Sequence, residues 1–257
     1  MATVPQNNNL PILYNDLVPL SSNDHGTWKT NPLDVAPYLV GQHAVPLTIE
    51  EFTSAQRFYP IVFSSGPQPV PLALMGLNEG VNTFVDEEGK LVRETYVPAY
   101  VRRYPFMLAR LRPGVDELSL CFDPTANAIS AEGEGPALFE DGKPTEVTQN
   151  MLQFCEQFER AAQQTQAFVE ELMEAKLLID GEVTIQPEGS DKPFIYRGFQ
   201  MVAEEKMREL RGDSLRKMSK NGMLPLIYAH MMSLPLMREI FGRQMAMGKV
   251  PPQEAVN

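Results

Sequence analysis

Apolar residues recur along the first half of the chain with two periods, which separate expected helices from expected strands. Leu47 and Phe52 flank Thr48 and Glu51 in the spacing of a capping box with a hydrophobic staple, which predicts a helix over 48–58. Short apolar or alternating runs between turn residues predict strands at 60–63, 70–77, 83–86, 91–93 and 117–122. A Glu-Glu-Gly sequence between the third and fourth of these runs predicts a hairpin turn.

The second half of the chain is dominated by one long amphipathic helix, predicted over 148–178. Its apolar stripe recurs at alternating steps of four and three residues: Met151, Cys155, Phe158, Ala162, Thr165, Val169 and Leu172. Asp180-Gly181 is predicted to end this helix, and Asp213 to cap a later one. Strands are expected at 183–185 and 194–201, and shorter helices at 203–210, 214–220, 223–234 and 235–247.

The order of these elements predicts the fold class and the domain organisation. Strands cluster before the long helix instead of alternating with helices, which favours an α+β fold. We expect a mixed or antiparallel sheet in the N-terminal half, with the long helix and the helical C-terminal segment packed on it. One domain is predicted over 14–247, between flexible tails at 1–13 and 248–257.

Charge narrows the range of partners. The formal net charge is −11, which argues against binding to nucleic acid and to anionic membranes. Residues 115–200 carry most of the negative charge and residues 201–257 are mildly basic. Nine of the fourteen methionines lie at or after Met201, and methionine-rich surfaces adapt to varied partners. We therefore expect a protein partner with an acidic surface, or self-association, through a removable docking helix at 235–247.

The densest cluster of aromatic and basic residues lies between 96 and 112. Pro98 and Pro105 divide it, and helical turns are expected between and after them. The candidate ligand- or partner-binding residues are drawn from this cluster and from the predicted helix at 223–234: Tyr100, Arg102, Arg103, Tyr104, Tyr228 and His230. The two arginines either grip an anion with forked hydrogen bonds or form an internal salt bridge with the acidic middle segment.

No pattern in the sequence predicts a catalytic or metal site. His25, His43 and His230 lack metal-ligand spacing, and neither Cys121 nor Cys155 has the signature of a catalytic nucleophile. We expect no cofactor and no metal, and a protein that is not an enzyme. The N-terminus shows no signal peptide and no stretch is apolar enough to cross a membrane, so a soluble, cytoplasmic protein is expected.

Several motifs in one order resemble the bacterial SapC family. The most specific is the run Tyr-Val-Pro-Ala-Tyr-Val-Arg-Arg-Tyr-Pro-Phe at 96–106. Similar landmarks are Tyr-Pro-Ile-Val-Phe at 59–63, Leu-Met-Gly-Leu at 74–77, Phe-Val-Asp at 84–86, Asp-Gly-Lys-Pro-Thr at 141–145 and Ile-Tyr-Ala-His at 227–230. The similarity runs from about Tyr14 to Met245. It concerns the family named from a surface-layer locus, not the peptide-transporter permease of the same name.

The resemblance implies a role linked to the bacterial surface layer and carries no catalytic residues. The first hypothesis is a non-enzymatic accessory or binding protein of the surface layer or cell envelope. The second is an enzyme, or an enzyme's accessory subunit, with a ligand site around Arg102, Arg103 and His230. The third is a structural subunit of the layer. Location at the cell surface would require a route without a cleaved signal peptide.

Overall fold

The computed structural model describes residues 10–32, 34–111, 118–187 and 192–250. It is an α+β protein with 38% helix and 22% strand, as predicted. All strand pairs between the described residues are antiparallel. The chain divides into two compact units, residues 1–34 with 101–159 and residues 35–100 with 160–257. Each unit is described by itself.

The first unit is built on a three-stranded sheet in the order β1-β7-β6. Its strands and short helices are β1 (Val18–Pro19), α1 (Ser22–His25), β2 (Lys29–Thr30), β6 (Phe106–Arg110), β7 (Leu118–Phe122), η3 (Pro124–Ala126), β8 (Ile129–Ser130), β9 (Phe139–Glu140) and β10 (Lys143–Pro144). Strands β9 and β10 form a hairpin in which Asp141 and Gly142 both have positive φ. The expected strand at 117–122 is confirmed over its described residues.

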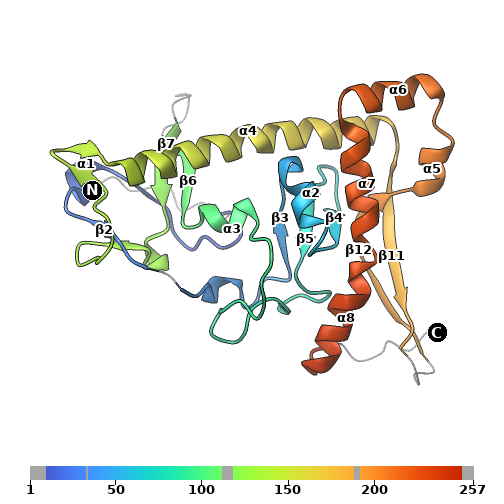
Figure 1. Ribbon diagram of the computed structural model, residues 1–257, viewed down its shortest axis with the longest axis horizontal. Coiled ribbons are helices and arrows are strands. Elements are labelled where there is room, and N and C mark those ends of the chain that lie inside the picture. The colour runs from blue at the N-terminus through green and yellow to red at the C-terminus, as the bar shows by residue number, and fades with distance from the viewer. Residues whose placement is uncertain (1–9, 33, 112–117, 188–191, 251–257) are drawn as a thin grey trace. The chain divides into compact units, whose positions relative to one another are not determined.

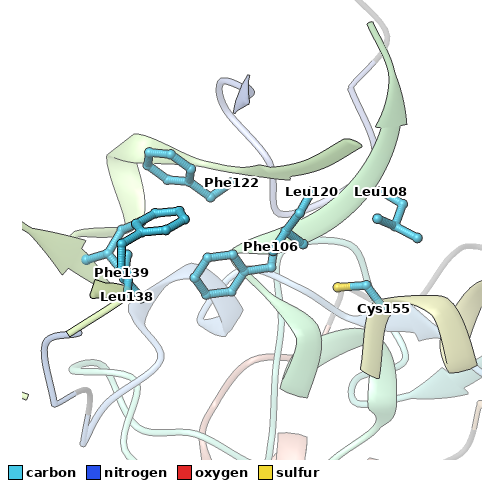
Figure 2. Close-up of a cluster of buried hydrophobic side chains, with 8 residues drawn as sticks. Phe106, Leu108, Leu120, Phe122, Leu138, Phe139 and Cys155 are labelled. Carbon is cyan, nitrogen blue, oxygen red and sulfur yellow. The ribbon is translucent and has the colours of Figure 1, made fainter. Parts of the chain in front are cut away.

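The core of the first unit lies between this sheet, the hairpin and the start of helix α4. Leu108 pairs with Leu120 and Phe106 with Phe122 across β6 and β7. Figure 2 shows Phe106 and Phe122 near Phe139 of the hairpin, while the thiol of Cys155 on α4 points toward the strands. Trp28 packs against the same cluster.

The second unit contains a five-stranded sheet in the order β11-β12-β4-β5-β3. Its elements are η1 (Pro37–Leu39), β3 (Ala44–Pro46), η2 (Ile49–Glu51), α2 (Phe52–Ala55), β4 (Ile61–Ser64), β5 (Pro71–Leu74), β11 (Leu178–Ile185), β12 (Phe194–Val202), α5 (Glu204–Arg208), α6 (Gly212–Lys220), α7 (Met223–Ser233) and α8 (Leu236–Ala246). Helix α7 contacts β4 and β12 and is drawn next to β12 in Figure 1. Two further helices, α3 (Ala99–Arg103) and α4 (Glu146–Glu174), include residues of both units.

The apolar stripe predicted for α4 is confirmed, but the end of the helix was misplaced. The helix ends at Glu174, and Lys176 takes a left-handed conformation that turns the chain into β11. Asp180 and Gly181 therefore lie inside a strand and do not end the helix. A Cβ on Gly181 would lie 2.1 Å from the Phe199 ring of β12, so close packing of that ring explains the glycine.

Three other local expectations need correction. The helix predicted over 48–58 is shorter, because a 3-10 turn, η2, precedes the four residues of α2. After Pro105 the chain forms strand β6 and not a helical turn, because Leu108 pairs in the sheet with β7. The N-cap of α6 is Arg211, and Asp213 lies in its first turn. The hairpin at 83–93 is present as a single bridge between Val85 and Leu91.

The expected removable helix at 235–247 is part of the core. In α8, Met237, Ile240 and Phe241 are buried, and Gln244 is fully buried. The Gln244 side chain accepts a hydrogen bond from the Leu77 backbone N–H at 2.6 Å. Removal of the helix would expose this apolar face and leave that N–H without its partner, so the helix belongs to the second unit's fold. Only its end matches the expectation, since Met245 and Met247 are exposed.

Candidate functional site

The start of the aromatic and basic cluster is held by a buried carboxylate. Glu51, which completes the predicted capping box, accepts a hydrogen bond from the Thr48 backbone N–H at 2.9 Å. Its other carboxylate oxygen accepts from the Tyr96 hydroxyl and from the backbone N–H of Ala99, the first residue of α3. One side chain thus satisfies orphan donors at the starts of two helical turns. Residues 96–99 are therefore fixed by the fold of the second unit.

The two neighbouring arginines of α3 have different environments. Arg103 is 6% exposed, and its Nη1 donates to Glu159 Oε1 at 3.2 Å. Its guanidinium carbon lies 4.0 Å from the centre of the Phe158 ring, in cation–π geometry. Arg102 is exposed and lies 5.2 Å from the centre of the Phe154 ring. The predicted ion pair with the acidic middle segment is confirmed for Arg103.

The tyrosines of the cluster are also buried in the fold. The Tyr104 hydroxyl donates to Asp123 Oδ2 at 3.3 Å, and its ring meets the Tyr14 ring edge to face at 5.1 Å. Asp123 is buried and also accepts the backbone N–H groups of Asn15 and Thr125. Tyr100 is buried as well, and belongs to the second unit. These contacts serve packing and leave little of either tyrosine for a partner.

His230 continues the hydrogen bonding between two strands that diverge. The register of β12 and β4 pairs Phe199 with Ser64 and, continued, would bring Val202 opposite Ile61. The imidazole of His230 bridges this pair: Nε2 accepts the Val202 N–H at 3.0 Å, and Nδ1 donates to the Ile61 carbonyl at 2.7 Å. The ring is fully buried, and burial lowers the His230 pKa to about 4. It is therefore neutral at pH 7 and structural in its contacts.

The residues predicted to bind a ligand or partner are divided between the two units. Arg102, Arg103 and Tyr104 belong to the first unit, and Tyr100, Tyr228 and His230 to the second. Of these six, Arg102 and Tyr228 are exposed, and Tyr228 has 47% of its surface accessible. Its neighbour on the same face of α7, Met232, is 70% exposed. Tyr228 thus remains a candidate for contact with a partner.

Helix α7 is apolar around its whole circumference, although only one side is buried. It contains no Asp, Glu, Lys or Arg, and Ile227, Ala229 and His230 are buried. Pro225, Tyr228 and Met232, spaced by three and four residues, are exposed together. A helix that is hydrophobic all round is normally covered on all sides. The exposed stripe is therefore a surface that a partner would shield from water.

A pocket of about 590 Å³ in the second unit contains residues that the sequence did not single out. The guanidinium carbons of Arg93 and Arg243 lie 5.1 and 4.9 Å from the centre of the Phe84 ring. Burial and then the charge of Arg93 lower the pKa of Arg243. The two arginines are far apart in the chain, and the only local signal was that Arg243 lies outside the apolar side of its helix.

The remaining candidate chemistry is limited. No cluster of three or more His, Cys, Asp or Glu with metal-binding geometry occurs within 10–32, 34–111, 118–187 and 192–250. Burial raises the thiol pKa of both Cys121 and Cys155 to about 11, so both are protonated at pH 7 and poor nucleophiles. Among the helices in the described part of the chain, none has the length and apolar character needed to span a membrane.

Comparisons with known proteins agree with the motifs in the sequence. No curated protein and no solved structure matches the chain. A family model described as SapC matches residues 20–240, which covers most of the chain. The match includes the Glu51-anchored motif, the Arg103–Glu159 pair and the imidazole bridge of His230. The chain therefore belongs to the SapC family.

Proposed function

We propose that this chain is a non-enzymatic binding protein of the bacterial cell envelope or surface layer, and that it docks an acidic protein partner on α7. The exposed apolar stripe of Tyr228 and Met232 carries this proposal. Aromatic residues and methionine are enriched where proteins meet, because they offer large apolar area with adaptable packing. The link to the surface layer rests on the implication of the family name.

Charge around the stripe favours an acidic partner. Residues 211–246, from the start of α6 to the end of α8, contain six Lys or Arg and two Asp or Glu, in a chain of net charge −11. Among them Arg216, Lys220 and Arg238 are exposed or half-exposed. These basic residues lie on α6 and α8, the helices that precede and follow α7 in the chain. They favour a partner that carries carboxylates, because complementary charge speeds encounter and selects the partner.

The contacts of the candidate ligand-site residues weigh against the enzyme alternative around Arg102, Arg103 and His230. Both ring nitrogens of His230 are occupied by backbone groups, and Arg103 is paired with Glu159. If His230 bound a substrate instead, the buried Val202 N–H and Ile61 carbonyl would lose their hydrogen-bond partners. The alternative of a structural layer subunit would instead require contacts between copies of the chain.

The experiment is a comparison of partners captured by three immobilised proteins from native lysate, with soluble and envelope fractions kept separate. The proteins are the natural chain, the double variant Tyr228→Glu/Met232→Glu, and the control Leu152→Glu. Leu152 is also an exposed apolar side chain on a helix, but it belongs to the other unit. All three should unfold alike, since exposed substitutions change stability by about 0.5 kcal/mol or less.

The expected result is an acidic envelope or surface-layer protein that the natural chain and Leu152→Glu retain and the double variant loses. Its affinity should fall by about tenfold or more, because aromatic anchors at interfaces contribute about 2 kcal/mol or more. A cytosolic enzyme as the sole partner would overturn the envelope assignment, and retention by the double variant would exclude the α7 surface. Calcium-dependent self-assembly, measured by sedimentation, would favour the structural-subunit alternative.

A further inference from the structure

The pocket beside α8 combines two arginines with an apolar wall. Its apolar lining comes from Val40, Val85, Val92, Ala246 and Met247. Arg93, Arg243 and Lys249 bring positive charge, and Asp86 and Glu87 bring negative charge. Its volume, about 590 Å³, lies in the range of small-molecule sites, which are about 300–1,000 Å³. It thus has room for a ligand with an apolar body.

Arg243 lines this pocket and has one guanidinium nitrogen without a partner in the described part of the chain. Its Nη2 donates to Glu239 Oε2 at 3.2 Å, on the preceding turn of α8. Its Nη1 is buried and has no hydrogen-bond partner among the described residues. Buried polar groups are nearly always paired, and an unpaired guanidinium nitrogen is costly, so such a group calls for an explanation. A bound acceptor would provide one.

A second guanidinium shares the same aromatic ring. Arg93 is exposed and packs on Phe84 together with Arg243. The Phe84 ring also packs against the tilted ring of Tyr59, with 4.6 Å between the ring centres, so Phe84 is part of the core. Two cations beside one ring repel each other, and the charge of Arg93 lowers the pKa of Arg243, so an anion near both would relieve this repulsion. The forked donors of arginine match a carboxylate.

We propose that this pocket binds an apolar molecule bearing a single carboxylate, with Arg243 and Arg93 on the carboxylate and the valines around the apolar body. A monoanion is favoured over phosphate because Asp86 and Glu87 also line the pocket and would repel a dianion. Asp86 Oδ1 accepts the backbone N–H groups of Glu88 and Lys90 in the turn, so this carboxylate is fixed in place. A free carboxylic acid and the C-terminus of a peptide share this chemistry.

Calorimetric titration of the full chain distinguishes the sources. The probes are hexanoate, 1-hexanol, N-acetylleucine, its amide and inorganic phosphate, each up to about 10 mM because small fragments bind weakly. Hexanoate or N-acetylleucine should bind at one site, and the neutral analogues should not. Preference for hexanoate indicates a free acid, and preference for N-acetylleucine indicates a peptide terminus. Tighter binding of phosphate, or no heat from either carboxylate, would overturn the proposal.

Variants locate the site. Arg93→Gln and Arg243→Gln should each weaken carboxylate binding by about tenfold or more, because each removes a charge-assisted hydrogen bond. Arg211→Gln is the control, since Arg211 is an exposed arginine at the start of α6 and outside the pocket. Arg93 is exposed, so its variant decides the matter if Arg243→Gln does not fold. Unchanged binding by Arg93→Gln in a folded protein would contradict the site. The titrations of the natural chain and of these variants do not involve the exposed stripe of α7, so their outcome is independent of the proposed function.

Discussion

Acidification should destabilise the second unit through His230. Burial lowers the pKa of this imidazole from 6.5 to about 4, so the unfolded chain binds a proton more readily than the folded one. The folded pKa is lower by about 2.5, and each pKa unit corresponds to about 1.4 kcal/mol, so charging this ring costs about 3 kcal/mol of stability. Because the folded pKa is depressed, the contribution of His230 to the free energy of unfolding is fully present above pH 6.5. It decreases between pH 6.5 and pH 4, and it is absent below pH 4.

The geometry explains why the proton is costly. In the neutral ring, Nε2 accepts a hydrogen bond from the Val202 N–H. Protonation of Nε2 would turn it into a donor that faces the Val202 N–H, so the hydrogen bond would be lost. His230→Gln offers the matched variant, because a carboxamide can still donate to Ile61 and accept from Val202 but does not titrate. His230→Ala instead leaves both buried backbone groups unpaired, at about 1–3 kcal/mol each, and should lose about 2–6 kcal/mol at pH 7.

The assay is urea unfolding between pH 7 and pH 4, with amide hydrogen exchange at Ile61 and Val202 as a readout confined to the second unit. The free energy of unfolding of the natural chain minus that of His230→Gln isolates the effect of the histidine, because both proteins share the carboxylates that titrate in acid. The difference in the free energy of unfolding should shrink by about 3 kcal/mol as the pH falls to 4. A difference that is constant with pH, or an NMR titration of His230 above pH 6, would refute the reasoning.

Two further predictions concern the aromatic and basic cluster. Glu51→Gln should destabilise the chain by about 2–4 kcal/mol, because an amide nitrogen replaces one of the two oxygens that accept hydrogen bonds from backbone N–H groups. The control Glu50→Gln, at an exposed position, should change stability little. Equal unfolding midpoints of the two variants in urea would contradict this. Arg103→Ala should lower stability by about 1–3 kcal/mol and the melting temperature by several degrees, because Arg103 is buried and paired with Glu159. Arg102→Ala, at an exposed position, should lower stability by about 0.5 kcal/mol. A larger loss for Arg102→Ala in calorimetry would show that the exposed arginine stabilises the fold.

Local patterns predicted most elements because their causes are local. The stripe of α4 follows from a helical period that each turn repeats, and the turn before β10 follows from the backbone freedom of Gly142. The end of α4 was misplaced because the reason for Gly181 is not local. A glycine after an aspartate is typical of a turn, but here it makes room for the Phe199 ring of the neighbouring strand.

The candidate sites depend even more on distant contacts. The apolar character of α7 is visible in the sequence, but the exposure of Tyr228 depends on which side the sheet covers. His230 was predicted as a candidate binding residue, whereas it is fully buried and makes two hydrogen bonds to the backbone. Arg93 and Arg243 meet over one ring although 149 residues lie between them in the chain. No spacing rule brings such a pair together.

The stretch by which the family is most easily recognised need not be the stretch that binds. At 96–106 three polar side chains have internal partners: the Tyr96 hydroxyl donates to Glu51, Arg103 pairs with Glu159, and the Tyr104 hydroxyl donates to Asp123. So many internal contacts demand particular residues in a particular order, which is sufficient to produce a specific motif without any ligand. The exposed face of α7 makes no such demands, because solvent tolerates many side chains. Large apolar groups at Tyr228 and Met232, where polar ones would suffice for the fold, are therefore the stronger indication of a partner.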